Sequence, residues 1–188
     1  MSFMLLGILN SQASGGGGGT YDLLETTTLG SSASSVTFTG LGSYSDYAHL
    51  QIRMVSRGDK ASNAADLLMQ INADTGSNYA WHTLRADGSN VSPFARDTKT
   101  ELDIGYVAGG NSTASSFSAS VLDILDFSNS SKNTTIRTLN GVSNEWTYIR
   151  LTSGLWNNTN AVTSLQFFAD AGNLVSGSRF SLFGRKGN

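Results

Sequence analysis

The chain has 188 residues, of which 39% are hydrophobic and 14% are charged, and its 12 basic and 14 acidic residues give a net charge of -2. This length suffices for one domain with an ordinary core, and a nearly neutral charge spread along the chain predicts no binding to nucleic acid or to an anionic membrane. Cysteine is absent, which excludes disulfides, thiolate metal sites and cysteine nucleophiles.

The chain begins with a short apolar leader that is followed by five glycines at 15–19. The apolar side chains of the leader are Phe3, Met4, Leu5, Leu6, Ile8 and Leu9. The leader is far shorter than the roughly 20 residues of a membrane-spanning helix, and no basic residue precedes it as in a signal peptide. It could form an edge strand of the domain itself or a peptide that docks on another protein. We favour docking, because a glycine run is costly to order, and we divide the chain into a docking arm at 1–14, a glycine tether at 15–19 and a β domain at 20–188.

After the tether, apolar residues recur at every second position in short segments that are bounded by Gly, Asn, Asp and Ser, as is typical of β-strands. The predicted strands lie at 36–38, 47–57, 65–73, 79–85, 100–107, 117–127, 134–139, 145–151, 162–169 and 178–183. Residues 60–68 could form one helical turn at most. The pattern predicts an all-β fold, an antiparallel and jelly-roll-like β-sandwich with an extended N-terminal arm. The many Ser and Thr side chains are expected on outward strand positions.

Three segments carry turn residues. Residues 72–78 predict a hairpin in which Gly76 takes a positive φ, and Asp87-Gly88 and Asn140-Gly141 predict two further corners. Oxygen-bearing side chains at 72–78 could also bind calcium, but the spacing and the final glutamate of a calcium loop are missing. We therefore predict no metal site.

Little in the sequence indicates catalysis. The two histidines, His49 and His82, lie in predicted strands, where an imidazole is more often a structural hydrogen-bonding group than a base. Asp123 and Asp126 near one strand end could satisfy the carboxylate spacing of a glycosidase, but nothing else supports that reaction. We predict a protein that is not an enzyme and needs no cofactor.

Aromatic residues offer a binding alternative. Trp156 is expected to be the most exposed tryptophan, and with Asn157 and Asn158 it could stack on and bond to a host glycan. Core packing or a subunit interface is the alternative role for the tryptophans.

The order of several segments resembles that of small virion structural proteins of tailed bacteriophages. These are the leader, the tether, and residues 21–26 (YDLLET), 35–39 (SVTFT), 49–53 (HLQIR), 74–79 (DTGSNY), 123–126 (DILD) and 177–184 (GSRFSLFG). The resemblance implies a location in the virion, other virion proteins as partners, and a homo-oligomer, with a trimer favoured. It implies a capsid decoration (cement) protein anchored by its arm, or alternatively a tail or tail-fibre component that binds host glycans.

Overall fold

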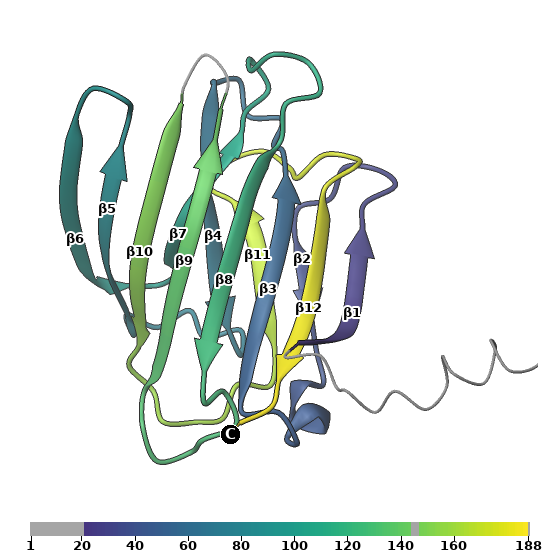
Figure 1. The fold of residues 1–188 in the computed structure, drawn as a ribbon, viewed down its shortest axis with the longest axis vertical. Coiled ribbons are helices and arrows are strands. Elements are labelled where there is room, and N and C mark those ends of the chain that lie inside the picture. The colour runs from purple at the N-terminus through teal and green to yellow at the C-terminus, as the bar shows by residue number, and fades with distance from the viewer. Residues whose placement is uncertain (1–20, 144–146, 188) are drawn as a thin grey trace, which may run out of the picture.

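The computed structural model describes residues 21–143 and 147–187, which form two antiparallel β-sheets packed against each other. An eight-stranded sheet has the order β1-β12-β3-β8-β9-β10-β5-β6, and a four-stranded sheet has the order β2-β11-β4-β7. In Figure 1 the eight-stranded sheet lies nearer to the viewer and the four-stranded sheet lies behind it. The predicted antiparallel β-sandwich is thus confirmed. The arm at 1–14 and the tether at 15–19 lie outside the described residues.

The strands are short and follow one another closely. The eight-stranded sheet contains β1 (Asp22–Thr28), β3 (His49–Ser56), β5 (Tyr79–Ala86), β6 (Val91–Lys99), β8 (Ser118–Leu125), β9 (Thr134–Val142), β10 (Tyr148–Trp156) and β12 (Arg179–Arg185). The four-stranded sheet contains β2 (Val36–Phe38), β4 (Ala64–Ile71), β7 (Leu102–Ala108) and β11 (Leu165–Ala169). The one helix of the described part is a 3-10 turn, η1 (Leu41–Tyr44). No helix found there has the length and apolar character to cross a membrane.

Each of the ten predicted strands corresponds to an observed one, but β1 and β6 were not predicted. Both are edge strands of the larger sheet. An edge strand pairs on one side only and can remain largely exposed, so its sequence need not alternate strictly. In β6, Pro93 and the neighbouring charged residues Arg96 and Asp97 hide the strand pattern. The single helical turn that 60–68 could have formed is not present, because β4 already begins at Ala64.

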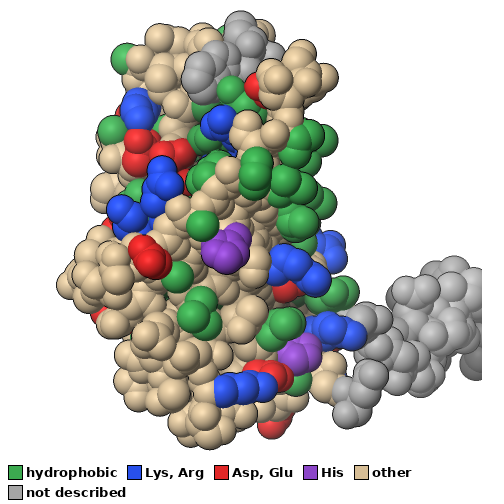
Figure 2. Space-filling model, turned by 90° about the vertical axis from the view of Figure 1, so that its left-hand side faces the viewer, with side chains coloured by type: hydrophobic (Ala, Val, Ile, Leu, Met, Phe, Trp, Pro, Cys, Tyr) green, Lys and Arg blue, Asp and Glu red, His purple; other side chains and the backbone are tan. Residues whose placement is uncertain are grey.

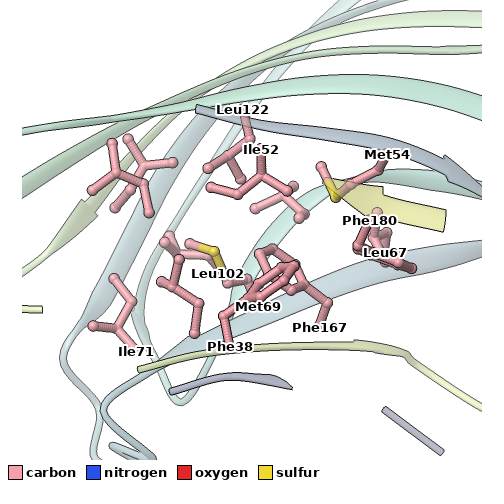
Figure 3. Packing of buried hydrophobic residues seen from close by; sticks show 14 of the residues in the cluster. Phe38, Ile52, Met54, Leu67, Met69, Ile71, Leu102, Leu122, Phe167 and Phe180 are labelled. Carbon is pink, nitrogen blue, oxygen red and sulfur yellow. The ribbon is translucent and has the colours of Figure 1, made fainter. Parts of the chain in front are cut away.

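Apolar side chains of both sheets meet in a single hydrophobic core. Ile52, Met54 and Leu122 extend from the eight-stranded sheet toward Met69 and Phe167 of the four-stranded sheet (Figure 3). All five are at most 2% exposed. The apolar residues that recur at every second position of the predicted strands 47–57 and 65–73 therefore include side chains that face the core.

The corner at Asp87-Gly88 is confirmed. It joins β5 to β6 as a hairpin, and Gly88 has a φ of +88°. The Asp87 carboxylate accepts hydrogen bonds from the backbone N–H groups of Ser89 (3.0 Å) and Asn90 (2.8 Å), which fixes the turn.

The hairpin predicted at 72–78 is wrong, because this segment connects β4 in one sheet to β5 in the other. Positive φ values occur at Asn72 and Ala73, both 54°, and not at Gly76. The Asn72 side chain accepts hydrogen bonds from the backbone of Thr163 (2.7 Å) and Ser164 (3.0 Å). These bonds fix the connection between β4 and β5 to the loop that precedes β11.

The corner predicted at Asn140-Gly141 is also wrong, because both residues lie inside β9. The Asn140 side chain does not cap a turn. It forms hydrogen bonds with the backbone of Tyr106 in the opposite sheet.

Candidate functional site

Part of the eight-stranded sheet has its side-chain polarity inverted. In β9, Thr138 and Asn140 point into the sandwich and are each 1% exposed, whereas Leu139 points to solvent and is 56% exposed. In β10, Thr152 is buried while the adjacent Leu151 is exposed. The expectation that Ser and Thr face outward is therefore wrong for Thr138 and Thr152, although it holds for Thr135 and Ser153. The leucines of β9 and β10 occupy the solvent side, which is normally polar in a sheet with one buried face.

The exposed apolar side chains form two neighbouring rows across the strands. The pairing register aligns Leu84, Leu151, Leu139 and Val121 in the first row. The second row contains Ala86, Ile149, Gly141, Ala119 and Val55. We call the six large side chains of these rows the apolar face: Val55, Leu84, Val121, Leu139, Ile149 and Leu151. Their exposure ranges from 37% for Val55 to 61% for Ile149.

A groove of about 800 Å³ crosses part of the apolar face. Leu139 and Ile149 line one side of it, and Leu23 and Phe183, from β1 and β12, line the other. Gly141 of β9 adds no side chain, and a Cβ there would have no atom within 4 Å, which leaves space between Ile149 and Ala119 in the second row. Figure 2 views the β6 edge of the sandwich and shows hydrophobic side chains gathered along the upper right of the molecule, where the outer face of the larger sheet is seen edge-on.

A polar row borders the apolar face. The register aligns His82, Ser153, Arg137, Asp123 and Gln51 beside the first apolar row. Asp123 accepts hydrogen bonds from Gln51 (2.9 Å) and Arg137 (3.3 Å). An apolar centre with a polar margin is the usual anatomy of a protein–protein interface.

The inner side of the same strands holds a buried cation. Arg150 is fully buried, its Nη2 donates to Asp103 Oδ2 at 2.9 Å, and its Nη1 lies 3.8 Å from Asp66 Oδ1. Its guanidinium also lies over the rings of Tyr106 (4.4 Å) and Phe94 (5.5 Å). These contacts explain why polar residues of β10 turn inward, since a buried charge is tolerated only when it is paired.

The positive charge of Arg150 does not fully offset the effects that raise the pKa of the neighbouring carboxyl group of Asp66. Burial raises the pKa of Asp66 to about 6, and the negative charges of Asp103 and Asp170 add to the effect, while Arg150 and Lys60 act against it. Asp66 therefore titrates in a weakly acidic range.

The residues predicted to bind glycan do not form an exposed platform. Trp156 is 1% exposed, and its Nε1 donates to Asp74 Oδ2 at 2.8 Å, so the expectation that it is the most exposed tryptophan is wrong. Trp156 is the last residue of β10 and points into the sandwich by the strand alternation. Asn157 and Asn158 follow in a loop, where Asn157 accepts a hydrogen bond from Asn133 at 2.9 Å.

Of the candidate catalytic residues, His49 and Asp126 lie side by side, with His49 Nδ1 3.4 Å from Asp126 Oδ1. His49 Nδ1 accepts the backbone N–H of Asp126 at 3.0 Å, and the Asp126 carboxylate pairs with Lys132. His82 is exposed on the outer face of β5. Within residues 21–143 and 147–187, no group of three or more His, Cys, Asp or Glu side chains could hold a metal ion.

The docking-arm residues, Phe3 to Leu9, and Trp146 lie outside the described residues.

No family model and no curated protein matches the chain. Similar solved structures include the CBM40 of the Ruminococcus gnavus IT-sialidase bound to α2,3-sialyllactose, with a TM-score of 0.37, 8% identity, and coverage of 89% of this chain and 95% of that one. The Caenorhabditis elegans galectin LEC-6 has a TM-score of 0.31 and 7% identity over 86% of this chain and 96% of that chain. The leech intramolecular trans-sialidase has a TM-score of 0.35 and 8% identity over 88% of this chain and 26% of that chain. At these values the likeness says nothing about a ligand or partner of this protein.

The apolar face was missed at the level of sequence. Residues 134–142 and 148–156 do alternate, but alternation alone does not tell which of the two sets faces the core. The register across β5, β10, β9 and β8 is what aligns their leucines into one surface.

Proposed function

We propose that this chain is a non-enzymatic structural protein of a tailed-bacteriophage virion. In this proposal it is a capsid decoration protein that is seated on neighbouring proteins through the apolar face and the docking arm at 1–14. The inverted polarity of β9 and β10 carries the proposal. A protein that stays free in water gains nothing from directing Leu139, Ile149 and Leu151 outward, and contiguous apolar patches of this kind mark interaction sites.

The chemistry of the face favours a protein partner. The six apolar side chains lie next to one another in the two rows, and the charged groups of the groove, Arg53 and Arg179, lie at one end of these rows beside Val121 and Val55. An apolar centre with charged groups at its margin fits a protein partner. Complete burial of one Leu or Ile side chain is worth about 1.5–3 kcal/mol, so several of them can offset the cost of association.

We propose a location in a virion because the sequence resembles that of small virion structural proteins of tailed bacteriophages. A decoration protein occupies many equivalent sites on the particle, which fits a homo-oligomer, with a trimer favoured. The apolar face would be the surface that contacts the particle. A tail or tail-fibre location is the alternative. The glycan-binding variant of that alternative has less support, because Trp156 is buried.

The double variant Leu139→Glu/Ile149→Glu tests the proposal. It places two charges on the apolar face at exposed positions, so we expect a folded protein that no longer joins phage particles in a binding assay. Thr135→Glu is the matched control, since Thr135 is exposed on the same face of β9 and lies outside the apolar face. Undiminished binding by the double variant would refute the proposal that the apolar face contacts the particle. Micrographs of particles labelled with an antibody against the chain distinguish the head from the tail.

A further inference from the structure

We infer that the chain binds a neutral carbohydrate in a cleft of about 370 Å³ between β6 and the strands β4 and β7. Phe94 of the cleft is paired with Thr83, which is buried, whereas the neighbouring Leu84 belongs to the apolar face. The cleft and the apolar face therefore lie on opposite sides of the eight-stranded sheet. A chain that contacts a particle through the apolar face keeps the cleft accessible, so the inference goes beyond the proposed function and does not rest on it.

The cleft forms where the hairpin of β5 and β6 extends past β7, the edge strand of the smaller sheet (Figure 1). Phe94 and Arg96 of β6 line one wall, and Asp66 of β4 and Tyr106 of β7 line the other. Figure 2 looks onto this edge of the sandwich, and acidic and basic side chains lie next to one another on its left-hand side. The volume of the cleft is within the range of small-molecule sites.

Aromatic side chains give the cleft an apolar lining. Phe94 and Tyr106 are half-buried, and Trp81, which also lines the cleft, is 7% exposed. The buried guanidinium of Arg150 lies 4.4 Å from the ring centre of Tyr106 and 5.5 Å from that of Phe94, so it fixes both rings without lining the cleft. The C–H groups of a sugar ring form an apolar surface that packs against the exposed part of such rings.

The charged groups of the cleft have both signs. The acidic residues are Asp66, Glu101, Asp103 and Asp170, and the basic residues are Arg96 and Lys99. A cationic ligand would meet the two basic groups, and an anionic ligand would meet the carboxylates. A hydroxyl group donates to a carboxylate and also accepts from a guanidinium or ammonium group. A neutral ligand with several hydroxyl groups therefore suits this lining better than a charged one.

Some of these polar groups have no hydrogen-bond partner in the described part of the chain. The Asp66 carboxylate accepts no hydrogen bond there, and Arg150 Nη1 lies 3.8 Å from its Oδ1. Arg150 Nη1 and Trp81 Nε1 are buried donors without an acceptor among the same residues. Buried donors are rarely left unpaired in folded proteins. Together, a free acceptor and two unpaired donors favour a ligand whose groups both donate and accept, as sugar hydroxyls do.

An array of immobilised oligosaccharides tests the inference with the labelled full chain. The array carries neutral oligosaccharides of glucose, galactose and mannose, with amino-sugar and uronic-acid counterparts as cationic and anionic probes. We expect binding to neutral members, and calorimetry with the strongest of them gives the affinity. No binding to any neutral member, or stronger binding to the charged counterparts, would overturn the inference.

Two variants test whether the carbohydrate occupies this cleft. Asp66→Asn removes a charged acceptor and Phe94→Ala removes an aromatic wall, so each should weaken the affinity roughly tenfold. Asp97→Asn and Val91→Ala are the matched controls, because both residues are exposed on β6 and neither lines the cleft, and they should leave the affinity unchanged. Urea denaturation shows that each variant is folded, and Asp66→Asn alone decides the test if Phe94→Ala does not fold. Equal affinities of Asp66→Asn and Asp97→Asn would overturn the inference.

The inference and the proposed function fail separately. Leu139→Glu/Ile149→Glu should keep the affinity for the carbohydrate, and Asp66→Asn should keep binding to phage particles. Loss of carbohydrate binding in the folded double variant would place the ligand on the apolar face and overturn the inference.

Discussion

Asn140 and Tyr106 form a pair of hydrogen bonds like that of two neighbouring strands, although they belong to opposite sheets. The Asn140 Nδ2 donates to the Tyr106 carbonyl oxygen at 2.9 Å, and the Tyr106 N–H donates to Asn140 Oδ1 at 2.9 Å. The same Nδ2 also donates to Ser120 Oγ at 2.8 Å. A side-chain amide thereby satisfies buried backbone groups of β7 and fixes the level at which β7 lies against β9.

The first prediction concerns the space that this amide requires. Gly105 precedes Tyr106 with a φ of +151°, and a Cβ at this position would lie 2.6 Å from Asn140 Cγ. We therefore expect Gly105→Ala to lower the free energy of unfolding by about 1–3 kcal/mol, the usual cost of overpacking. Urea denaturation measures the change. Gly141→Ala is the matched control in β9, where a Cβ would meet no atom within 4 Å, and a loss as large as that of Gly105→Ala would contradict the steric argument.

A second prediction concerns the ion pair between Arg150 and Asp103, which also joins the sheets. Arg150→Met leaves the Asp103 carboxylate, only 12% exposed, without its cation. We expect a loss of about 3–5 kcal/mol, since removing one partner of a buried pair strands the other charge. Arg150→Met/Asp103→Leu should recover most of that loss in a double-mutant cycle.

The surface pair of Arg137 and Asp123 provides the comparison. Its atoms lie 3.3 Å apart, but the Arg137 side chain is 66% exposed. We expect Arg137→Met to cost less than about 1 kcal/mol. Equal losses of unfolding free energy for Arg137→Met and Arg150→Met would mean that burial does not determine how much the pair of Arg150 and Asp103 contributes to stability.

A third prediction is a loss of stability as the pH rises. Burial, together with Asp103 and Asp170, raises the pKa of Asp66 from 3.8 to about 6. Between about pH 4 and pH 6 the folded state therefore holds a proton that the unfolded state has released, so the free energy of unfolding falls as pH rises through this window. The Asp66 side chain is 42% exposed, so solvent screening limits its contribution to about 1 kcal/mol. Burial also raises the pKa of Asp103, which acts in the same direction.

Urea denaturation at several pH values between 4 and 7 measures this effect as the difference between the wild type and Asp66→Asn. The variant should lose less stability across the window. Asp87→Asn is the control without an effect in this window, because hydrogen bonds from the backbone of Asn90 and Ser89 lower the pKa of Asp87 below its ordinary value of 3.8, so Asp87 stays ionised in both states. Parallel pH profiles for the wild type and Asp66→Asn would show that Asp66 does not titrate in this range.

The sequence predicts where the strands of this fold lie better than it predicts which of their side chains face the core. Leu50, Ile52 and Met54 alternate with polar residues and do face the core, because burial of the apolar set is the simplest use of such a pattern. The same rule fails for Leu139 and Leu151, where the neighbouring inward residues Asn140 and Arg150 bond across the sandwich to β7. Those bonds join residues far apart in the chain, so no local pattern reveals them.

Trp156 illustrates the same limit, and its burial leads to the last prediction. A tryptophan followed by two asparagines has the composition of a surface loop, but its indole N–H bonds to Asp74, 82 residues earlier in the chain. Burial acts to raise the pKa of Asp74, but hydrogen bonds from Trp156, Asn78 and the backbone of Gly76 outweigh it and hold the pKa below its ordinary value.

Trp156→Phe removes a hydrogen bond to a carboxylate, so we expect a loss of about 1.5–3 kcal/mol in unfolding free energy and a rise in the pKa of Asp74, measured by urea denaturation and by NMR titration. Trp81→Phe is the matched control. Trp81 is 7% exposed, and its Nε1 has no hydrogen-bond partner among the described residues, so replacing it loses no such bond and should cost less. If Trp156→Phe left the stability unchanged and instead abolished binding to a host polysaccharide, Trp156 would be a contact residue and the burial argument would be wrong.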